Sequence, residues 1–516
     1  MASYDLRYES WIPVEFIGGG SGAVGLHDAL VRAHEIREIG GDSPVEAIAL
    51  NRLLLALAIR THPETESEDG WFERWDAGSL DPAAINSYLE KWGDRFDLFH
   101  PEHPFYQVRT NTGNSVLAVS MLRIHECGNV PELYSHVNLR SGETMSPAEA
   151  AVGVVASQFA TSGGLLSNPF KTGNKNTPFM GSAVFWLRGR SLFEALMLNA
   201  PPTSLFRMGG SQLNVDDAPA WEVEPSAGQS ERASRGILDF LTFQHRRLTL
   251  LLGDDGESDA VVVGLRRTGG DHASPRPLDE PHIAVLEESK TRPRGPYAMR
   301  PDRALWRDSS IFMTLLKDGG SKAPLAFQWV SDHTAQLHTD RFLVDVFGMR
   351  TRGANDGTFL FWRRESMPLF TRTLTDPTIG QTVMQLLERA EKQREHLRAA
   401  IYTVARLVVP STEEVAKFTT ALDAEGRYWG VLEAPFYDAV RQVVEGGERN
   451  EVLRSWTAHL HRTAFAAFDS ATSSLDGSGR QLQAVAVGRR QLRPAARYSI
   501  PAVPPSTHAS TLETLQ

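Results

Sequence analysis

The chain has 516 residues, of which 41% are hydrophobic and 22% are charged, as in an ordinary globular protein. Its length predicts two or three domains. The formal net charge of −10 disfavours a protein that holds nucleic acid on its own through a basic surface, although local basic loops or positively charged partners remain compatible with it.

A single cysteine, Cys127, excludes an intrachain disulfide and a thiolate zinc cage. The first ten residues lack the basic start and apolar core of a signal peptide. Apolar runs such as AIALNRLLLALAI (47–59) are too short and too interrupted to span a bilayer. We therefore expect a cytoplasmic protein without a membrane segment.

Residues 11–33, WIPVEFIGGGSGAVGLHDALVRA, predict a strand, a glycine-rich turn and a helix. The turn contains G-x-G-x-x-G at 20–25, the spacing of a dinucleotide-binding turn. Pro13 and Glu15, however, suit an edge strand, and we expect residues 34–42 to finish a helix instead of forming the next parallel strand. A hairpin loop is the favoured interpretation, and an NAD(P)-dependent oxidoreductase is the alternative.

Three helices are predicted by the same start signal, a capping residue followed by proline. They begin at Ser43, Asp81 and Ser146, and the first and third carry glutamate at the capping-box position. Two short segments, 182–189 and 247–253, are rich in strand-forming residues. The N-terminal part is therefore expected to be mixed α/β.

A long polar loop and several basic runs are candidates for binding. Residues 161–178, TSGGLLSNPFKTGNKNTP, form a loop of a length that is often functional. Arginine and lysine gather at 288–307, 348–364 and 488–497. Each run alone is equally well explained as solvated surface. Together they suggest contacts with phosphate groups.

The composition changes near residue 375. Asp376-Pro377 begins a long amphipathic pattern that Pro410 ends, and further helical patterns follow. We predict an α+β protein: a large mixed α/β N-terminal domain, an all-α four-helix bundle and a disordered tail. The further helices are expected at about 412–422, 433–446, 450–474 and 480–493, and the three regions at 1–374, 375–497 and 498–516.

No pattern marks a catalytic centre, since G-x-S-x-G and paired catalytic carboxylates are absent. Cys127 is best interpreted as a packing cysteine. The segments FHPEHPF (99–105) and SDHTAQLHTD (331–340) are favoured as structural or surface histidines. The alternative is a metal site at Asp332, His333 and Asp340. We expect no metal, no cofactor and no enzymatic activity.

Several segments, taken in order, resemble the CasA family, the large subunit of the type I-E CRISPR surveillance complex Cascade. They are WIPV (11–14), GLHDALVRAHEI (25–36), FDLFHPEHPFYQV (96–108) and FKTGNKNTPFMGSAVFWLRGRSLFEALMLNA (170–200). The length and the helical C-terminal part agree as well, so the resemblance covers nearly the whole chain.

The resemblance implies a non-catalytic protein that recognises the protospacer-adjacent motif (PAM) in double-stranded DNA, starts to open the duplex and recruits a helicase–nuclease. It implies further partners in the other Cascade subunits and in the 5′ end of the guide RNA. Two other interpretations stay open: the oxidoreductase, and a scaffold subunit that never touches DNA.

The resemblance also implies site residues. The family's glycine-rich minor-groove loop falls on TSGGLLSNP, and its lysine finger falls near LEESKT (286–291), which favours Lys290 with Arg292 in reserve. The wedge hairpin falls on RGANDG (352–357), which lacks the glutamine common in the family. The loop that contacts guide RNA or a neighbouring subunit falls on LYSHVNLRS (133–141). The remaining residues implied are Gly163, Gly164, Ser167 and Asn168 in the first loop, Arg352, Gly353, Asn355 and Asp356 in the wedge, and His136 and Asn138 in the last loop.

Overall fold

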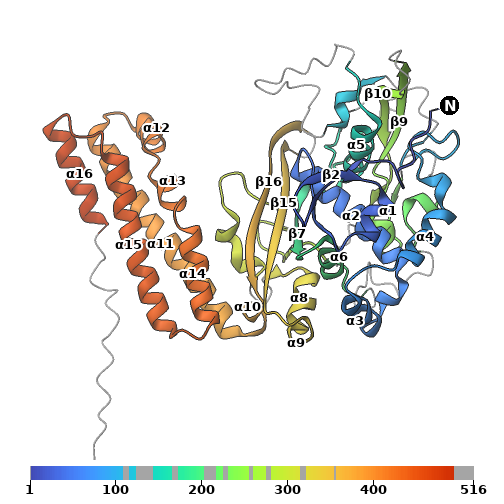
Figure 1. The fold of residues 1–516 in the computed structure, drawn as a ribbon. Helices are drawn as coiled ribbons and strands as arrows, with labels where there is room; N and C mark the ends of the chain where they lie inside the picture. The colour runs from blue at the N-terminus through green and yellow to red at the C-terminus, as the bar shows by residue number, and fades with distance from the viewer. Residues whose placement is uncertain are drawn as a thin grey trace, which may run out of the picture. The chain divides into compact units, whose positions relative to one another are not determined.

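A computed structural model describes most of the chain, in two compact units, Met1–Gly380 and Gln381–Gln516 (Figure 1). The division falls inside a helix, whereas the sequence places it just before that helix. The described residues are 2–108, 116–123, 143–165, 173–202, 217–224, 230–254, 260–274, 280–313, 321–353 and 356–492.

The first unit opens with an antiparallel sheet in which β1 (Ile12–Phe16) lies between β2 (Ser21–Val24) and β3 (Ile36–Ile39). The glycine run turns the chain from β1 into β2, with Gly19 and Gly20 at φ of +93° and +89°, a region that glycine enters without steric cost. The favoured hairpin loop is confirmed. The dinucleotide-binding turn is wrong, because it requires a parallel strand–helix–strand unit.

Two expectations about this sheet are also wrong. β1 is the central strand, and residues 36–39 form β3 instead of the end of a helix. Proline has no N–H to donate to a neighbouring strand, and the central strand tolerates Pro13 because its pairing with β3 ends at this residue. The last bond is accepted by the Pro13 carbonyl from Gly40 N (2.8 Å), one residue beyond β3.

The helix starts read from the sequence are confirmed. α2 (Pro44–Thr61) begins with a capping box in which Glu46 N donates to Ser43 Oγ (3.3 Å) and Ser43 N donates to Glu46 Oε2 (3.2 Å). α5 (Pro147–Phe159) has the same box, and Asp81 caps α4 (Pro82–Lys91). Nearly every residue of α2 is buried, so this helix forms the centre of the unit.

The main sheet is antiparallel, with β15 (Arg341–Gly353) between β7 (Ala183–Arg188) and β16 (Asp356–Phe370). β7 pairs only with Leu343–Gly348, so the hairpin continues toward its turn as two strands, as Figure 1 shows. A second sheet joins β4 (Leu117–Ala118), β10 (Ala260–Gly269) and β9 (Arg246–Asp254). β7 and β9 are the strands expected at 182–189 and 247–253.

Shorter elements complete the first unit. The helices are α1 (Leu26–Val31), α3 (Glu68–Ala77), α6 (Leu192–Asn199), α7 (Ile237–Leu241), α8 (Leu325–Asp332), α9 (Thr334–Leu337) and α10 (Arg372–Thr375), with 3₁₀ turns η1 (Pro63–Glu66), η2 (Gly93–Arg95), η3 (Val119–Leu122), η4 (Pro178–Gly181), η7 (Ala220–Glu222) and η8 (Leu305–Ile311). The strands are β5 (Gly164–Leu165), β6 (Gly173–Asn174), β8 (Glu231–Arg232), β11 (His272–Ala273), β12 (Val285–Leu286), β13 (Gly295–Pro296) and β14 (Ser321–Lys322).

The described part of the second unit is helical. Its helices are α11 (Pro377–Val408, which begins in the first unit), α12 (Thr412–Leu422), α13 (Ala424–Trp429), α14 (Glu433–Val444), α15 (Arg449–Thr472) and α16 (Gly479–Gln491). All but α13 were expected, and the apolar positions predicted to line one face of α11 are buried. Trp456 Nε1 on α15 donates to Leu386 O on α11 (2.9 Å). The four-helix bundle stays a prediction, and the tail 498–516 lies outside the described residues.

Within the described ranges, no helix is both long and apolar enough to cross a membrane.

Two buried histidines of the first unit are held in their neutral form. Asp81 N donates to His62 Nε2 (2.8 Å), and a main-chain N–H can only donate, so Nε2 carries no proton. His282 Nε2 donates to the carbonyl of Asn199 (2.8 Å). Burial lowers the pKa of both histidines below the ordinary value.

Acid should therefore destabilise this protein through these two groups. Unfolded histidine binds protons below about pH 6.5, where the folded state still resists them, so stability is full above that pH and is lost as the pH falls. We expect the free energy of unfolding to drop by up to about 1.4 kcal/mol per pH unit for each histidine. Urea unfolding between pH 5 and 7.5 measures this. His62→Gln should reduce the slope of the unfolding free energy against pH, and the control His34→Gln, at an exposed site, should not. Equal slopes in the two variants would contradict the role of His62.

Candidate nucleic-acid interface

Strand β7 is the common root of three of the four loops that the resemblance implied. The chain enters β7 from η4, which follows the glycine-rich loop. One edge of β7 pairs with β15 of the long hairpin. At the other edge of β7, Ala183 N donates to Tyr297 O (2.7 Å) and Phe185 N donates to His282 O (2.8 Å). The segment that carries Lys290 therefore lies beside β7.

The glycine-rich loop leaves α5 and returns to η4 through two joined arms. β5 and β6 pair antiparallel, with Gly164 opposite Asn174. Nearer the root, Thr161 N donates to Thr177 Oγ1 (2.8 Å), and Thr177 N donates to Thr161 O (3.1 Å). Gly163 N donates to the side-chain oxygen of Asn176. Gly163 and Gly164 thus lie on an outgoing arm whose position is set by the returning one.

A buried arginine of the central helix joins two loop roots. Arg52 is 4% exposed, and its guanidinium is paired with Glu280 and lies over the rings of Phe159 (5.0 Å) and Phe240 (5.6 Å). Phe159 ends α5 just before the glycine-rich loop, and Glu280 begins the segment that leads to Lys290. Removing either member of the pair would leave a buried charge without its partner.

Lys290 lies at the tip of a tight turn between β12 and β13. Ser289 N donates to Arg292 O (2.8 Å), and Arg292 N donates to Ser289 O (3.2 Å). The Lys290 side chain is exposed, and among the described residues its ammonium has no ion-pair or hydrogen-bond partner. Arg292 Nη2, by contrast, donates to Glu287 O (3.1 Å), and Arg294 pairs with the Glu287 carboxylate (3.1 Å). Of these three cations, Lys290 is the one whose charged group has no bond to the described residues.

The long hairpin is anchored at its root by a charged cluster. Arg364 Nη2 on β16 donates to Glu38 Oε2 (2.6 Å) and to Asp345 Oδ2 (2.7 Å). Arg188 Nη2 on β7 donates to the same Glu38 oxygen (2.6 Å). Burial alone would raise the pKa of Glu38, but the bonds from Arg364 and Arg188 hold it below its ordinary value. The cluster ties the hairpin to β3.

The hairpin also packs against the segment that returns from the Lys290 turn. Arg363 Nη2 donates to Arg300 O (3.1 Å) and Arg303 O (3.0 Å). A Cβ at Gly348 would lie 2.5 Å from Met299 Sδ, so a larger residue there would force the Met299 side chain to move. At the far end Gly353 pairs with Asp356, and the turn between them holds two residues.

Several arginines of the basic runs at 288–307, 348–364 and 488–497 form ion pairs within the protein, which the sequence did not indicate. Arg303 pairs with Asp308 (2.6 Å), and Arg363 pairs with Glu365 (2.6 Å). In the third run Arg489 pairs with Asp469 (2.9 Å). The suggestion that these runs contact phosphate is therefore weaker for these arginines, whose charge already has a partner.

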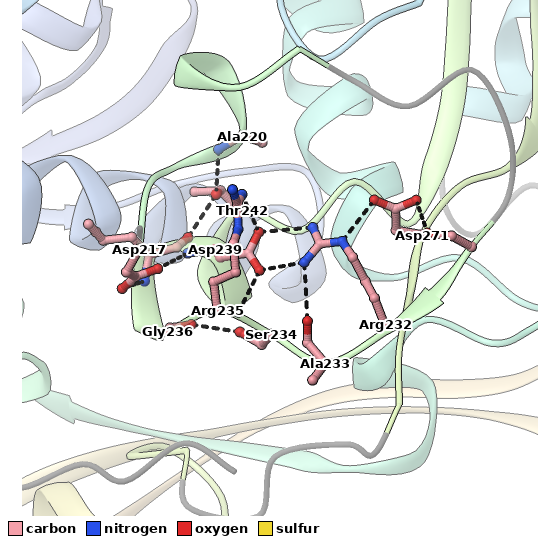
Figure 2. Close-up of polar contacts among 12 residues, drawn as sticks. Asp217, Ala220, Arg232, Ala233, Ser234, Arg235, Gly236, Asp239, Thr242 and Asp271 are labelled. Atoms are coloured by element: carbon pink, nitrogen blue, oxygen red, sulfur yellow. Dashed lines mark hydrogen bonds and ion pairs between the residues drawn. The ribbon is translucent and has the colours of Figure 1, made fainter. Parts of the chain in front are cut away.

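A cluster that the sequence did not single out is shown in Figure 2. The Arg232 guanidinium lies between Asp239 (2.7 and 3.0 Å) and Asp271 (3.2 Å), and Arg235 also reaches Asp239 (3.1 Å). Asp217 accepts the N–H groups of the first turn of α7. The charges satisfy one another, so the cluster is structural. Arg235 and Asp239 are four residues apart, a spacing that the sequence could have indicated, whereas no spacing indicates Asp217 or Asp271 as partners.

Of the two histidines in 331–340, His333 is structural and His338 is exposed. His333 Nδ1 is bonded to Trp329 O (2.8 Å), and Nε2 is bonded to Glu68 Oε1 (3.1 Å). The His333 ring also packs on Trp329, at 3.8 Å between centroids. In the described part of the chain, no three His, Cys, Asp or Glu side chains are grouped to hold a metal ion.

Several predicted site residues lie outside the described residues: Ser167, Asn168, His136, Asn138 and Asn355. The same holds for Cys127, which was interpreted as a packing cysteine. Arg352, Gly353 and Asp356 are placed by their main chain at the end of the hairpin.

Comparisons with known proteins identify the family. The profile of CRISPR-associated protein Cse1 (CRISPR_cse1) matches residues 5–467. The chain is 29% identical over 513 residues to the CRISPR-associated protein CasA/Cse1 of Thermus thermophilus, covering 95% of this chain and 97% of that one. The solved structure of T. thermophilus CasA (Cse1) superposes with a TM-score of 0.79 at 27% identity, over 95% of this chain and 98% of that one.

A structure titled "CRISPR RNA-guided surveillance complex" includes a chain of the same fold, with a TM-score of 0.74 at 21% identity over 95% of this chain and 100% of that one. The family profile matches most of this chain, which establishes its family. This protein belongs to the Cse1 (CasA) family, the large subunits of type I-E Cascade complexes.

The root of the hairpin should be sensitive to the charge of Glu38. Glu38→Gln removes a carboxylate that accepts hydrogen bonds from Arg188 and Arg364, and we expect a loss of about 2 kcal/mol in the free energy of unfolding. Glu35, on the same segment, has a side chain 50% exposed and pairs with Arg32. Glu35→Gln is the control and should cost less than about 0.5 kcal/mol. Urea unfolding compares the two; equal losses would contradict a special role for Glu38.

Proposed function

We propose that this protein is the non-catalytic subunit that reads the PAM for a cytoplasmic, guide-RNA-bearing Cascade complex. It recognises the motif in double-stranded DNA, helps to open the duplex for R-loop formation and recruits the helicase–nuclease that degrades the target. Membership of the Cse1 family supports its place among other Cascade subunits and guide RNA. In this division of labour the protein reads a short motif and base pairing reads the rest.

The observation that carries the proposal is the open ammonium of Lys290 at the tip of the β12–β13 turn. A lysine can donate to the acceptors that line the floor of the minor groove. That groove distinguishes base pairs poorly, so such a contact accepts several related motifs. These partners favour Lys290 as the finger, with Arg292, which is exposed and donates to a main-chain carbonyl, in reserve.

The glycine-rich loop is proposed as the second contact. Gly163 and Gly164 carry no side chain that would hold the main chain away from a base-pair edge. Ser167 and Asn168 would add small polar groups to the same contact. Contacts to phosphate position a protein on a duplex, whereas contacts to base edges in a groove carry the sequence preference, so this loop would contribute to reading the motif.

The tip of the β15–β16 hairpin is proposed as the wedge. Beyond its pairing with β7 it continues as a two-stranded projection, and the root is held by β7, by Glu38 and by the segment 299–303. A projection with a firm root can part a base step mechanically, even with small polar residues such as Asn355 and Asp356 at its tip. Arg352 would contact the phosphates beside it.

The net charge of −10 agrees with a subunit that works inside an assembly. Partner subunits would supply most of the positive field, and His136 and Asn138 would face the guide RNA or a neighbouring subunit. A scaffold that never touches DNA is the competing function. A mobility-shift assay on PAM-bearing duplex, with and without guide-loaded partners, separates the two, because a scaffold would leave the affinity independent of the PAM.

Lys290→Ala should weaken binding of the reconstituted complex to PAM-bearing duplex by about tenfold, since a groove contact is worth about 1–3 kcal/mol. Binding to a target whose strands are already separated should change less than about twofold, because that target bypasses PAM readout. Lys91→Ala removes another exposed lysine and is the control. Equal losses on both targets would overturn the finger assignment.

Deleting residues 354–355 should slow duplex opening, followed by 2-aminopurine fluorescence next to the PAM, more than it slows the first encounter with the PAM. The deletion shortens the projection, whereas Asn355→Ala keeps its length and should leave the opening rate within about twofold. An opening rate unchanged by the deletion would remove the wedge role.

A further inference from the structure

Arg246, the first residue of β9, lies buried beneath the root of the glycine-rich loop. It is 3% exposed. Its Nη2 donates to the carbonyl oxygens of Thr161 (3.0 Å), Ser162 (3.2 Å) and Lys175 (2.9 Å), and its Nη1 donates to His245 O (2.8 Å). Thr161 and Ser162 lie on the outgoing arm of the loop and Lys175 on the returning arm. One guanidinium therefore joins the two arms.

The Arg246 main chain is itself fixed to the helix from which the loop departs. Arg246 N donates to Gln158 Oε1 (2.9 Å), and Gln158 Nε2 donates back to Arg246 O (3.0 Å). Gln158 is in the last turn of α5 and is also buried. The main-chain bonds to Gln158 fix Arg246 near the end of α5, and the Arg246 guanidinium in turn binds both arms of the loop.

The chemistry of this contact suits arginine and no other residue. All the partners that the described residues give to the guanidinium are main-chain carbonyls, and burial, together with the Arg267 charge, lowers the pKa of Arg246 to about 9. The group is still charged at neutral pH. Its planar fork aims donors in fixed directions at several acceptors, whereas a lysine ammonium, a point charge on a shorter stem, would bond fewer of these carbonyls.

Its neighbour Arg247 provides a natural comparison. Arg247 is 2% exposed, and its Nη2 pairs with Asp271 Oδ1 (2.8 Å), the carboxylate that also binds Arg232 in Figure 2. The two arginines are adjacent, equally buried and equally charged. Arg246 is bonded to the glycine-rich loop, and Arg247 is bonded to the cluster of Figure 2.

We propose that Arg246 is a positioning residue for PAM readout: it sets the separation of the two loop arms and so presents the main chain of Gly164 to the minor groove, while the buried Gly163 belongs to the joined part of the arms. The role rests on the proposed function, because it acts through the loop that is proposed to contact DNA. Arg246 itself does not touch the duplex.

Variants Arg246→Met, Arg246→Lys and Arg247→Met are to be assembled into the guide-loaded complex. The first readout is PAM discrimination, the ratio of the affinities for duplexes with and without the PAM, alongside the affinity for a target with separated strands. The second is hydrogen exchange of the amides at 161–165 and 173–177, which reports the clamp without DNA. Arg247→Met is the matched control for general destabilisation.

We expect Arg246→Met to reduce PAM discrimination about tenfold, with less than twofold change on the separated target, and to accelerate exchange in both arms. Arg246→Lys should recover a part of both, and Arg247→Met should leave both near wild type. If Arg246→Met does not assemble, Arg246→Lys decides. If the wild-type complex discriminates the PAM and the Arg246 variants discriminate it equally well, the positioning role alone is overturned. The same follows if Arg247→Met loses as much discrimination as Arg246→Met. Absence of discrimination in the wild type would overturn the proposed function, and the positioning role with it.

Discussion

The hydrogen bonding of β7 on both of its edges is the constraint on which the candidate interface depends. A strand with both edges paired cannot shift in register without breaking main-chain hydrogen bonds on each side and exchanging the side chains that pack on its two faces. β7 is buried from Ala183 to Leu187, so its register is strongly specified. The glycine-rich loop enters it, the long hairpin pairs with it, and the Lys290 segment lies beside it.

Buried charges then fix each loop to this frame. Arg52 joins the roots of the glycine-rich loop and the Lys290 segment, Glu38 anchors the hairpin, and Arg246 clamps the glycine-rich loop. Burying a charge is costly unless its partners are complete, and a satisfied network admits few alternative arrangements. The protein thus places its polar networks beneath the loops. Lys290, at the outermost point of its turn, keeps a cation that the surrounding residues do not neutralise.

Much of the fold could be predicted because its signals are local. The capping boxes at Ser43 and Ser146 span three residues, and the apolar face of α11 repeats at helical spacing, so both can be read without a partner segment. The N-terminal sheet was harder. Whether Pro13 lies at an edge or in the centre depends on where β3 ends, and residues 36–39 are too few to show a strand period against a helical background.

The sequence by itself determined the three capped helices, most helices of the second unit and the hairpin at the glycine run. The segments that resemble the CasA family, taken in order, determined the family. Only the tertiary structure decided which charged residues are open to a ligand. Arg364 finds Glu38 across 326 positions, and Arg246 finds Thr161 across 85. Such partners leave no spacing to read, because an ion pair depends on how distant segments pack and not on their order. The same packing gives Arg292 and Arg294 bonds to Glu287 and gives Lys290 none among the described residues, a difference that the composition of the segment does not show.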